Sequence, residues 1–198
     1  MGLIKNHRCI RPHIAGLQRI VYKALPCDLQ KFESSLNRRA HRWDSSRPVE
    51  LADQLRCFLK LSVKSIPGTV RFSFILAFLN AWHTPGRFQE TAGCPLCDAA
   101  DGSSIEHWLR CPCWHATVLP LLDLSPFDHS RTVLAHILGL SDHACQIRWA
   151  LFVDSIYHAL IAWRHRSAEA ARSAPIARLK FLRYRFPGHS LYAGRWGG

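Results

Sequence analysis

Residues 94–112 read Cys-Pro-Leu-Cys-Asp-Ala-Ala-Asp-Gly-Ser-Ser-Ile-Glu-His-Trp-Leu-Arg-Cys-Pro. Four residues in this stretch follow the spacing C-x2-C-x9-H-x3-C: Cys94, Cys97, His107 and Cys111. A C-x2-C turn lets two thiolates converge on one tetrahedral ion, and a helical turn brings two residues four positions apart to one face. We therefore expect these four side chains to bind one Zn²⁺. The site would be structural, because four protein ligands leave no open position for substrate.

The residues between the ligands agree with this interpretation. Asp101-Gly102 predicts a turn, and Ser103 followed by Glu106 predicts a capping box that begins a helix before His107. Pro112 favours an end of that helix at Cys111. Three alternatives stay open, namely redox chemistry or another metal at the cysteines, replacement of a ligand by Cys113 or His115, and four unrelated buried side chains.

Outside this segment, the spacing of apolar residues predicts helices. Helical patterns cover a stretch that starts at Ser45-Ser46-Arg47-Pro48, with a capping serine and a proline in the first turn, and the ranges 70–82, 131–140 and 145–166. Since no stretch alternates with period two, the expected fold class is mainly α, a small helical domain with an embedded CCHC-type zinc knuckle and few or no strands. The expected organisation is a basic, weakly structured arm (1–44), a helical segment (45–90), the zinc knuckle (91–116), a second helical segment (117–186) and a flexible tail (187–198).

The eight cysteines bear on the cellular compartment. Residues 1–20 contain four basic side chains and no apolar core of a secretory signal, and the apolar runs at 72–82 and 144–163 are too short or too charged to span a bilayer. We expect a nuclear or cytoplasmic protein that is not secreted and has no membrane partner. In a reducing compartment, clustered cysteines more often bind metal than form disulfides. The isolated Cys9, Cys27, Cys57 and Cys145 are expected to be buried apolar residues.

The charge of the 198-residue chain is strongly positive, with 26 Lys and Arg against 14 Asp and Glu and a formal net charge of +12. The surplus lies in residues 1–90 and 161–198, whereas residues 91–130 are mildly acidic. Such a surplus favours polyanions, above all RNA or single-stranded DNA, as partners. Basic residues interleaved with aromatics suit phosphate contact and base stacking. The candidate contacts are Arg38, Arg39, Arg42, Trp43, Arg178, Lys180, Arg183, Tyr184 and Arg185.

The segment Cys94-Pro-Leu-Cys97…Ile105-Glu-His-Trp-Leu-Arg-Cys-Pro112 resembles the zinc-binding region that follows the polymerase in reverse transcriptases of non-LTR (LINE-like) retrotransposons. In that family the region reads C-x2-C, an acidic residue, and then H-hydrophobic-x-x-C-P. Residues 79–88 look like the lead-in of some retroelement-derived proteins, and the match covers roughly residues 70 to 115. The resemblance implies a module that helps a reverse transcriptase to hold template RNA or target DNA.

Catalytic motifs are missing from the sequence. The paired aspartates of the polymerase and any endonuclease are absent. No strand precedes Asp101-Gly-Ser, as a ribonuclease H aspartate would need, and Phe152-Val-Asp-Ser lacks the second carboxylate of a two-metal site. We therefore expect no enzyme activity and no catalytic residues. The alternative functions are a zinc-stiffened helical module that docks on a protein partner through its apolar helices, with any exposed tryptophans as anchors, and a retroelement relic without a function.

Overall fold

The computed structural model describes residues 29–62, 65–82, 84, 93–102, 104–126, 132–165 and 167–186. The chain divides into two compact units, Met1–Ser35 and Leu36–Gly198. Every contact discussed below lies within the second unit. Among the described residues all regular elements are helical, which confirms the expected mainly α class. No helix in this part of the chain combines the length and the apolar character that a bilayer crossing needs.

The helices of the described residues occupy the following ranges: α2 (Leu29–Trp43), α3 (Pro48–Leu61), α4 (Gly68–Phe78), α5 (Ile105–Arg110), α6 (Pro112–Thr117), the 3-10 helix η3 (Pro120–Leu122), α7 (Val133–Leu138), α8 (His143–His165) and α9 (Ala168–Arg185). The expectation of a weakly structured arm over 1–44 is wrong for its last part, because α2 is a 15-residue helix. Residues 1–28 and the expected tail 187–198 lie outside the described residues.

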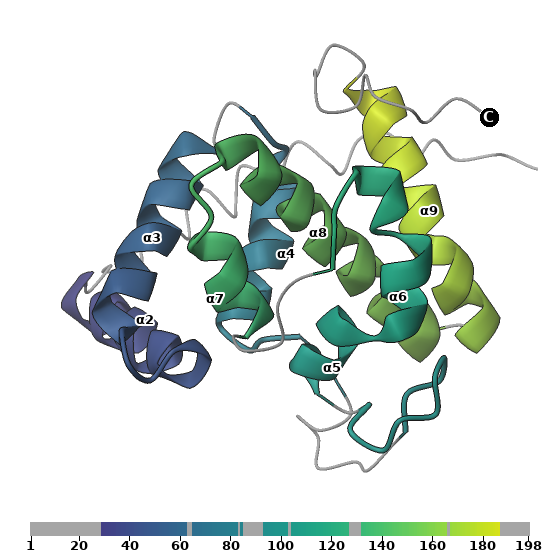
Figure 1. Cartoon of the computed structure of the whole chain (residues 1–198), viewed down its shortest axis with the longest axis horizontal. Helices are drawn as coiled ribbons and strands as arrows, with labels where there is room; N and C mark the ends of the chain where they lie inside the picture. The colour runs from purple at the N-terminus through teal and green to yellow at the C-terminus, as the bar shows by residue number, and fades with distance from the viewer. Residues whose placement is uncertain are drawn as a thin grey trace, which may run out of the picture. The chain divides into compact units, whose positions relative to one another are not determined.

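The longest helix, α8, packs against both α4 and α9, while α3 packs against α7 (Figure 1). Large side chains of α8 are buried along its length, among them Trp149, Phe152 and Ile156. A helix with apolar residues on several faces is stable only when neighbours cover those faces. The core of the second unit therefore forms around α8.

A buried ion pair joins α8 to its two neighbours. Asp154 of α8 is fully buried, and its Oδ2 accepts a 2.7 Å hydrogen bond from Nε of Arg178 in α9. Its Oδ1 accepts from the Ser73 hydroxyl of α4 at 2.6 Å. Arg178 also donates from Nη2 to Oγ1 of Thr69 at 3.1 Å. A buried carboxylate is tolerated only with such partners, so this cluster fixes how α4, α8 and α9 pack together.

Helix α4 ends at Phe78, four residues earlier than the apolar pattern predicted. Asn80 has a left-handed φ of 52°, and its N–H donates to Ala77 O at 2.9 Å. The next amide, that of Ala81, donates to Leu76 O at 2.7 Å. These two bonds form the Schellman motif that commonly ends helices, with asparagine in place of glycine. Trp82 nevertheless reaches the core, where its Nε1 donates to Ser73 O.

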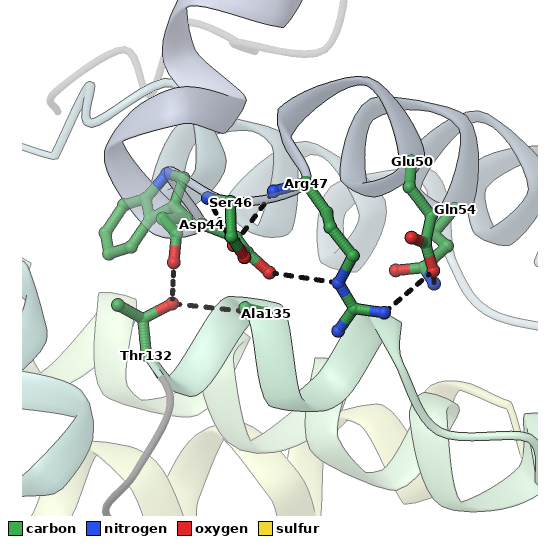
Figure 2. Close-up of polar contacts among 8 residues, drawn as sticks. Asp44, Ser46, Arg47, Glu50, Gln54, Thr132 and Ala135 are labelled. Carbon is green, nitrogen blue, oxygen red and sulfur yellow. Dashed lines mark hydrogen bonds and ion pairs between the residues drawn. The ribbon is translucent and has the colours of Figure 1, made fainter.

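The start of α3 uses Pro48 at its first position as predicted, but the predicted serine cap is wrong. The N-cap residue is Arg47, whose side chain makes no capping bond. Instead, Oδ1 of Asp44 accepts from the amides of Ser46 and Arg47 (Figure 2). Thr132, the N-cap of α7, donates from its hydroxyl to Trp43 O at 2.7 Å. The turn before α3 is therefore fixed by Asp44 and linked to the start of α7.

Candidate metal centre

The four predicted ligands gather at one point, and we call them the Cys/His cluster: Cys94, Cys97, His107 and Cys111. Their nearest donor atoms all lie within 4.8 Å of one another, so the cluster could hold a metal ion. The sulfur atoms of Cys94 and Cys111 are 3.8 Å apart, and Sγ of Cys97 lies 3.4 Å from Nε2 of His107. All but Cys97 are buried. The sequence spacing therefore does bring these side chains together.

Short local elements position the cluster. Ser104 caps α5 by accepting from the His107 amide at 3.0 Å, so the cap is Ser104 rather than the predicted Ser103, which lies outside the described residues. Helix α5 ends at Arg110, and Cys111 leaves the helical region with ψ of 123°. Pro112 then occupies the first position of α6, where a proline costs no hydrogen bond. The proline ends one helix as predicted and also starts the next.

The thiols lie where backbone amides can stabilise negative charge. A hydrogen bond from the Cys111 thiol, together with the amides of Leu96 and Cys97, lowers the pKa of Cys94 to about 4 against the cost of burial. The same thiol–thiol contact raises the pKa of Cys111. Burial raises the pKa of Cys97, although the Ala99 amide opposes this shift. The loop therefore favours one thiolate even without an ion, which suits a cation-binding site.

Asp101, which the sequence predicts to lie in a turn, contacts the Cys/His cluster. Its Oδ1 lies 2.7 Å from Nδ1 of His107. This carboxylate holds the ring so that Nδ1 carries the proton and Nε2 is free to face the sulfurs. Histidines that bind metals usually donate their other nitrogen to such a carboxylate. An acidic residue in the turn before a candidate ligand histidine is the sequence pattern that indicates this role for Asp101.

Gly102 lets two backbone segments meet behind the cluster. A Cβ atom at this position would lie 2.0 Å from the Cys94 amide nitrogen and 2.4 Å from its Cα. Both atoms belong to the backbone, so neither can move aside without displacing the first ligand. The Gly102 carbonyl accepts a 2.8 Å hydrogen bond from Nε1 of Trp108. Position 102 therefore excludes every side chain.

Two contacts connect the cluster to the helical core. The ring of Trp108 packs against those of Trp114 and Trp163, with centroid separations of 6.4 and 5.5 Å. Glu106, which precedes the ligand His107, accepts from the Val133 amide at the start of α7 at 3.1 Å. Burial raises the pKa of Glu106, against the opposing effects of this bond and of Arg110. The loop that carries the Cys/His cluster is therefore a continuous part of the fold.

The alternative ligands point elsewhere. The Cys113 thiol donates to Leu96 O at 3.4 Å, and Nε2 of His115 lies 3.0 Å from Leu109 O. No disulfide joins any of the described cysteines. The expectation that Cys57 is buried is wrong, because it is exposed, whereas Cys145 is half-buried. Cys9 and Cys27 lie outside the described residues.

Two of the predicted nucleic-acid contacts do not lie on the surface as free side chains. Trp43 is buried and donates from Nε1 to Phe78 O at 2.7 Å, so it belongs to the core. Arg178 is only 11% exposed and is bound to Asp154, so it cannot serve as a freely available phosphate contact. The remaining predicted side chains are exposed: Arg38, Arg39 and Arg42 on α2, and Lys180, Arg183, Tyr184 and Arg185 on α9.

The tryptophans are core residues throughout the described chain. Five of them are buried: Trp43, Trp82, Trp108, Trp114 and Trp149. Trp163 is half-buried against Trp108, and Trp196 lies outside the described residues. None of these six tryptophans is exposed, so among the described residues no tryptophan is available to anchor a protein partner.

We also compared the chain with known proteins. No family model, no curated protein and no solved structure matches the chain. The functional argument therefore depends on the residues and their geometry.

Proposed function

We propose that this chain is a zinc-stabilised helical module that binds single-stranded nucleic acid, RNA or single-stranded DNA. The observation that carries the proposal is the convergence of three thiols and one imidazole within a fold whose exposed α9 surface is basic. The retroelement resemblance of residues 94–112 supports the same class of partner. A separate reverse transcriptase is the enzyme that such a module would assist.

The donor set supports Zn²⁺ as the ion. Two sulfurs bound at about 2.3 Å to a tetrahedral ion lie about 3.8 Å apart, and a sulfur and an imidazole nitrogen lie about 3.5 Å apart. The corresponding separations here are 3.8 Å for Cys94 and Cys111, and 3.4 Å for Cys97 and His107. Soft thiolates with one imidazole favour zinc over Mg²⁺ or Ca²⁺. Four protein ligands complete the tetrahedron, so the ion has a structural role.

The metal centre does not itself supply positive charge. Three thiolates and one divalent ion sum to a local charge of about −1. Attraction to phosphates must come from surface cations, and six of the predicted contacts are exposed cations on α2 and α9: Arg38, Arg39, Arg42, Lys180, Arg183 and Arg185. Tyr184, with 85% of its surface exposed, adds an aromatic ring beside these cations on α9.

The test combines metal analysis with a nucleic-acid titration on the full-length chain. We expect one zinc per chain, and a log–log slope of affinity against salt of about −4 on a single-stranded oligonucleotide if the six cations each contact a phosphate. Lys180→Glu should weaken binding and reduce the steepness of that slope, whereas Lys60→Glu, an exposed lysine on α3, should leave the slope unchanged. A flat slope, or no binding at low salt, would refute the nucleic-acid proposal.

A further inference from the structure

An open groove runs between α8 and α9, with a volume of about 520 Å³. Apolar side chains line it from both helices, Ile161 and Ala162 from α8 and Ala174 and Ala177 from α9. Phe181 of α9 also lines the groove and is 51% exposed. Pockets of roughly 300 to 1,000 Å³ with apolar walls and few polar groups are typical small-molecule sites.

Besides its aliphatic side chains and the Ser173 hydroxyl, the groove is lined by flat rings and a guanidinium. His158 and His165 line it from α8, and Arg178 lines it from α9 beside Phe181. The Arg178 guanidinium carbon lies 5.6 Å from the centre of the Phe181 ring. Because Asp154 and Thr69 hold Arg178 in place, the Phe181 ring packs against a fixed neighbour. A positioned ring with an open surface is suited to stacking by another flat aromatic group.

The positive charge around the groove favours flat ligands that are negatively charged. Among the described residues no carboxylate lines the groove, and helical geometry places Arg185 one turn after Phe181 on the same side of α9. Lys180 and Tyr184 are exposed on the adjoining side of the helix. The basic side chains beside the Phe181 ring therefore favour a ligand that has a flat aromatic ring and a negatively charged group next to it. A nucleotide fits this description, because it combines a flat base with a phosphate.

The length of the groove limits the ligand to a short piece of strand. The lining runs over seven residues of α8, from His158 to His165, and over eleven residues of α9, from Ala170 to Phe181, which corresponds to about 10 and about 16 Å along the two helix axes. A groove of this length accepts one base or a few stacked bases of an unpaired strand. A base that is paired inside a duplex cannot enter it without leaving its stack.

We propose that the α8–α9 groove binds an unpaired nucleobase of single-stranded nucleic acid, which stacks on Phe181 while Lys180 and Arg185 contact the flanking phosphates. This inference rests on the proposed function and makes it more specific, because it predicts a preference for single strands and gives Arg178 a role. Arg178 is a positioning residue that supports the ring from within the fold.

The experiment measures binding of two single-stranded oligonucleotides with the same number of phosphates, one with bases and one made of abasic sites. The proteins are the wild type, Phe181→Leu, Ala177→Trp, and the matched control Phe72→Leu, which changes an exposed phenylalanine on α4. Phe181→Leu keeps an apolar side chain but removes the ring, and Ala177→Trp fills the groove.

We expect Phe181→Leu and Ala177→Trp to weaken binding of the base-containing strand roughly 5- to 100-fold, the range of one or two lost stacking contacts. Binding of the abasic strand should be equal for all four proteins, and the salt slope should not change. If the wild type binds both strands alike and Phe181→Leu has no effect, the groove inference is overturned while the proposed function stands. If the wild type binds neither strand, both are overturned.

Discussion

The Cys/His cluster and the ion pair at Asp154 join distant parts of the chain in different ways. The cluster takes its ligands from a short segment, with only 17 positions between Cys94 and Cys111. Asp154 instead reaches Arg178, 24 positions further on, and Ser73, 81 positions earlier. The spacing of residues along the chain is therefore enough to predict the Cys/His cluster. The Asp154 ion pair, in contrast, forms only when α4, α8 and α9 pack together.

The two sites also differ in the source of their stability. Metal binding to a site that is not formed in the unfolded chain contributes its binding free energy to folding. A buried ion pair offsets the cost of desolvating its own two charges and adds little beyond that, although removal of one partner is costly. The cluster should therefore depend on the metal, and the α4–α8–α9 packing should depend on charge balance.

The largest effect is expected from loss of a ligand. Cys94→Ser or His107→Ala should abolish zinc binding, a contribution of about 10 kcal/mol or more in small zinc-binding peptides, and should reduce the helical signal of α5 and α6. Metal content and far-UV circular dichroism measure both outcomes. Cys113→Ser is the matched control, because its thiol contacts Leu96 O and should leave zinc bound. Equal zinc content in Cys94→Ser and wild type would contradict the assignment.

The next effect concerns the ion pair. Arg178→Ala leaves the Asp154 carboxylate buried without its cation and should lower the free energy of unfolding by about 3–5 kcal/mol. Denaturant unfolding measures this loss. Lys180→Ala, two positions away and exposed, should change stability by less than about 0.5 kcal/mol.

A double variant sharpens the same prediction. Asp154→Leu combined with Arg178→Met replaces both charges with apolar side chains and should be more stable than Arg178→Ala alone. A double variant that is as unstable as the single one would show that the helices need this particular polar geometry.

A smaller effect is expected from Asp101, which positions the ligand His107. Asp101→Asn should weaken zinc affinity about 10- to 100-fold without unfolding the protein, because the ring loses its charged partner at Nδ1. Competition with a chelator of known affinity measures the change. Asp98→Asn is the control, since Asp98 is an exposed carboxylate in the same loop and asparagine tolerates its left-handed φ of 57°. Equal losses in both variants would argue against a specific role for Asp101.

The smallest effect is a pH dependence at the ion pair. Burial lowers the pKa of His158 below its ordinary value of 6.5, with opposing contributions from Asp154, which raises the pKa, and Arg178, which lowers it. The folded state therefore favours the neutral ring, and its contribution to stability is present above about pH 6.5 and is lost as the pH falls. His158→Gln should flatten the change in Tm between pH 7.5 and 5.5 relative to wild type. Parallel profiles would contradict this account.

The sequence predicted the local features well. The convergence of the Cys/His cluster, the helix end before Pro112 and the proline at the start of α3 follow from short-range spacing and backbone sterics. The end of α4 was missed because Asn80 took the left-handed position usually held by glycine. The left-handed tolerance of asparagine is the sequence signal for this helix boundary.

The errors among the proposed contacts have a different cause. Trp43 and Arg178 were assigned to the surface from their basic neighbours, but Trp43 packs into the core and Arg178 neutralises a buried carboxylate. Both roles depend on partners 35 and 24 positions away, respectively. Composition and periodicity carry no information on which distant residue will face a given side chain.

The backbone of Gly102 lies so close to that of Cys94 that substitutions at position 102 can show whether the protein is under natural selection. Any amino-acid replacement adds at least a Cβ atom, which would overlap the backbone of the first ligand. In a library that carries every substitution at every position, codon 102 should tolerate none as long as cells require the bound metal. If the chain were a relic without a role, the same codon would accept all nineteen replacements as freely as an exposed loop does.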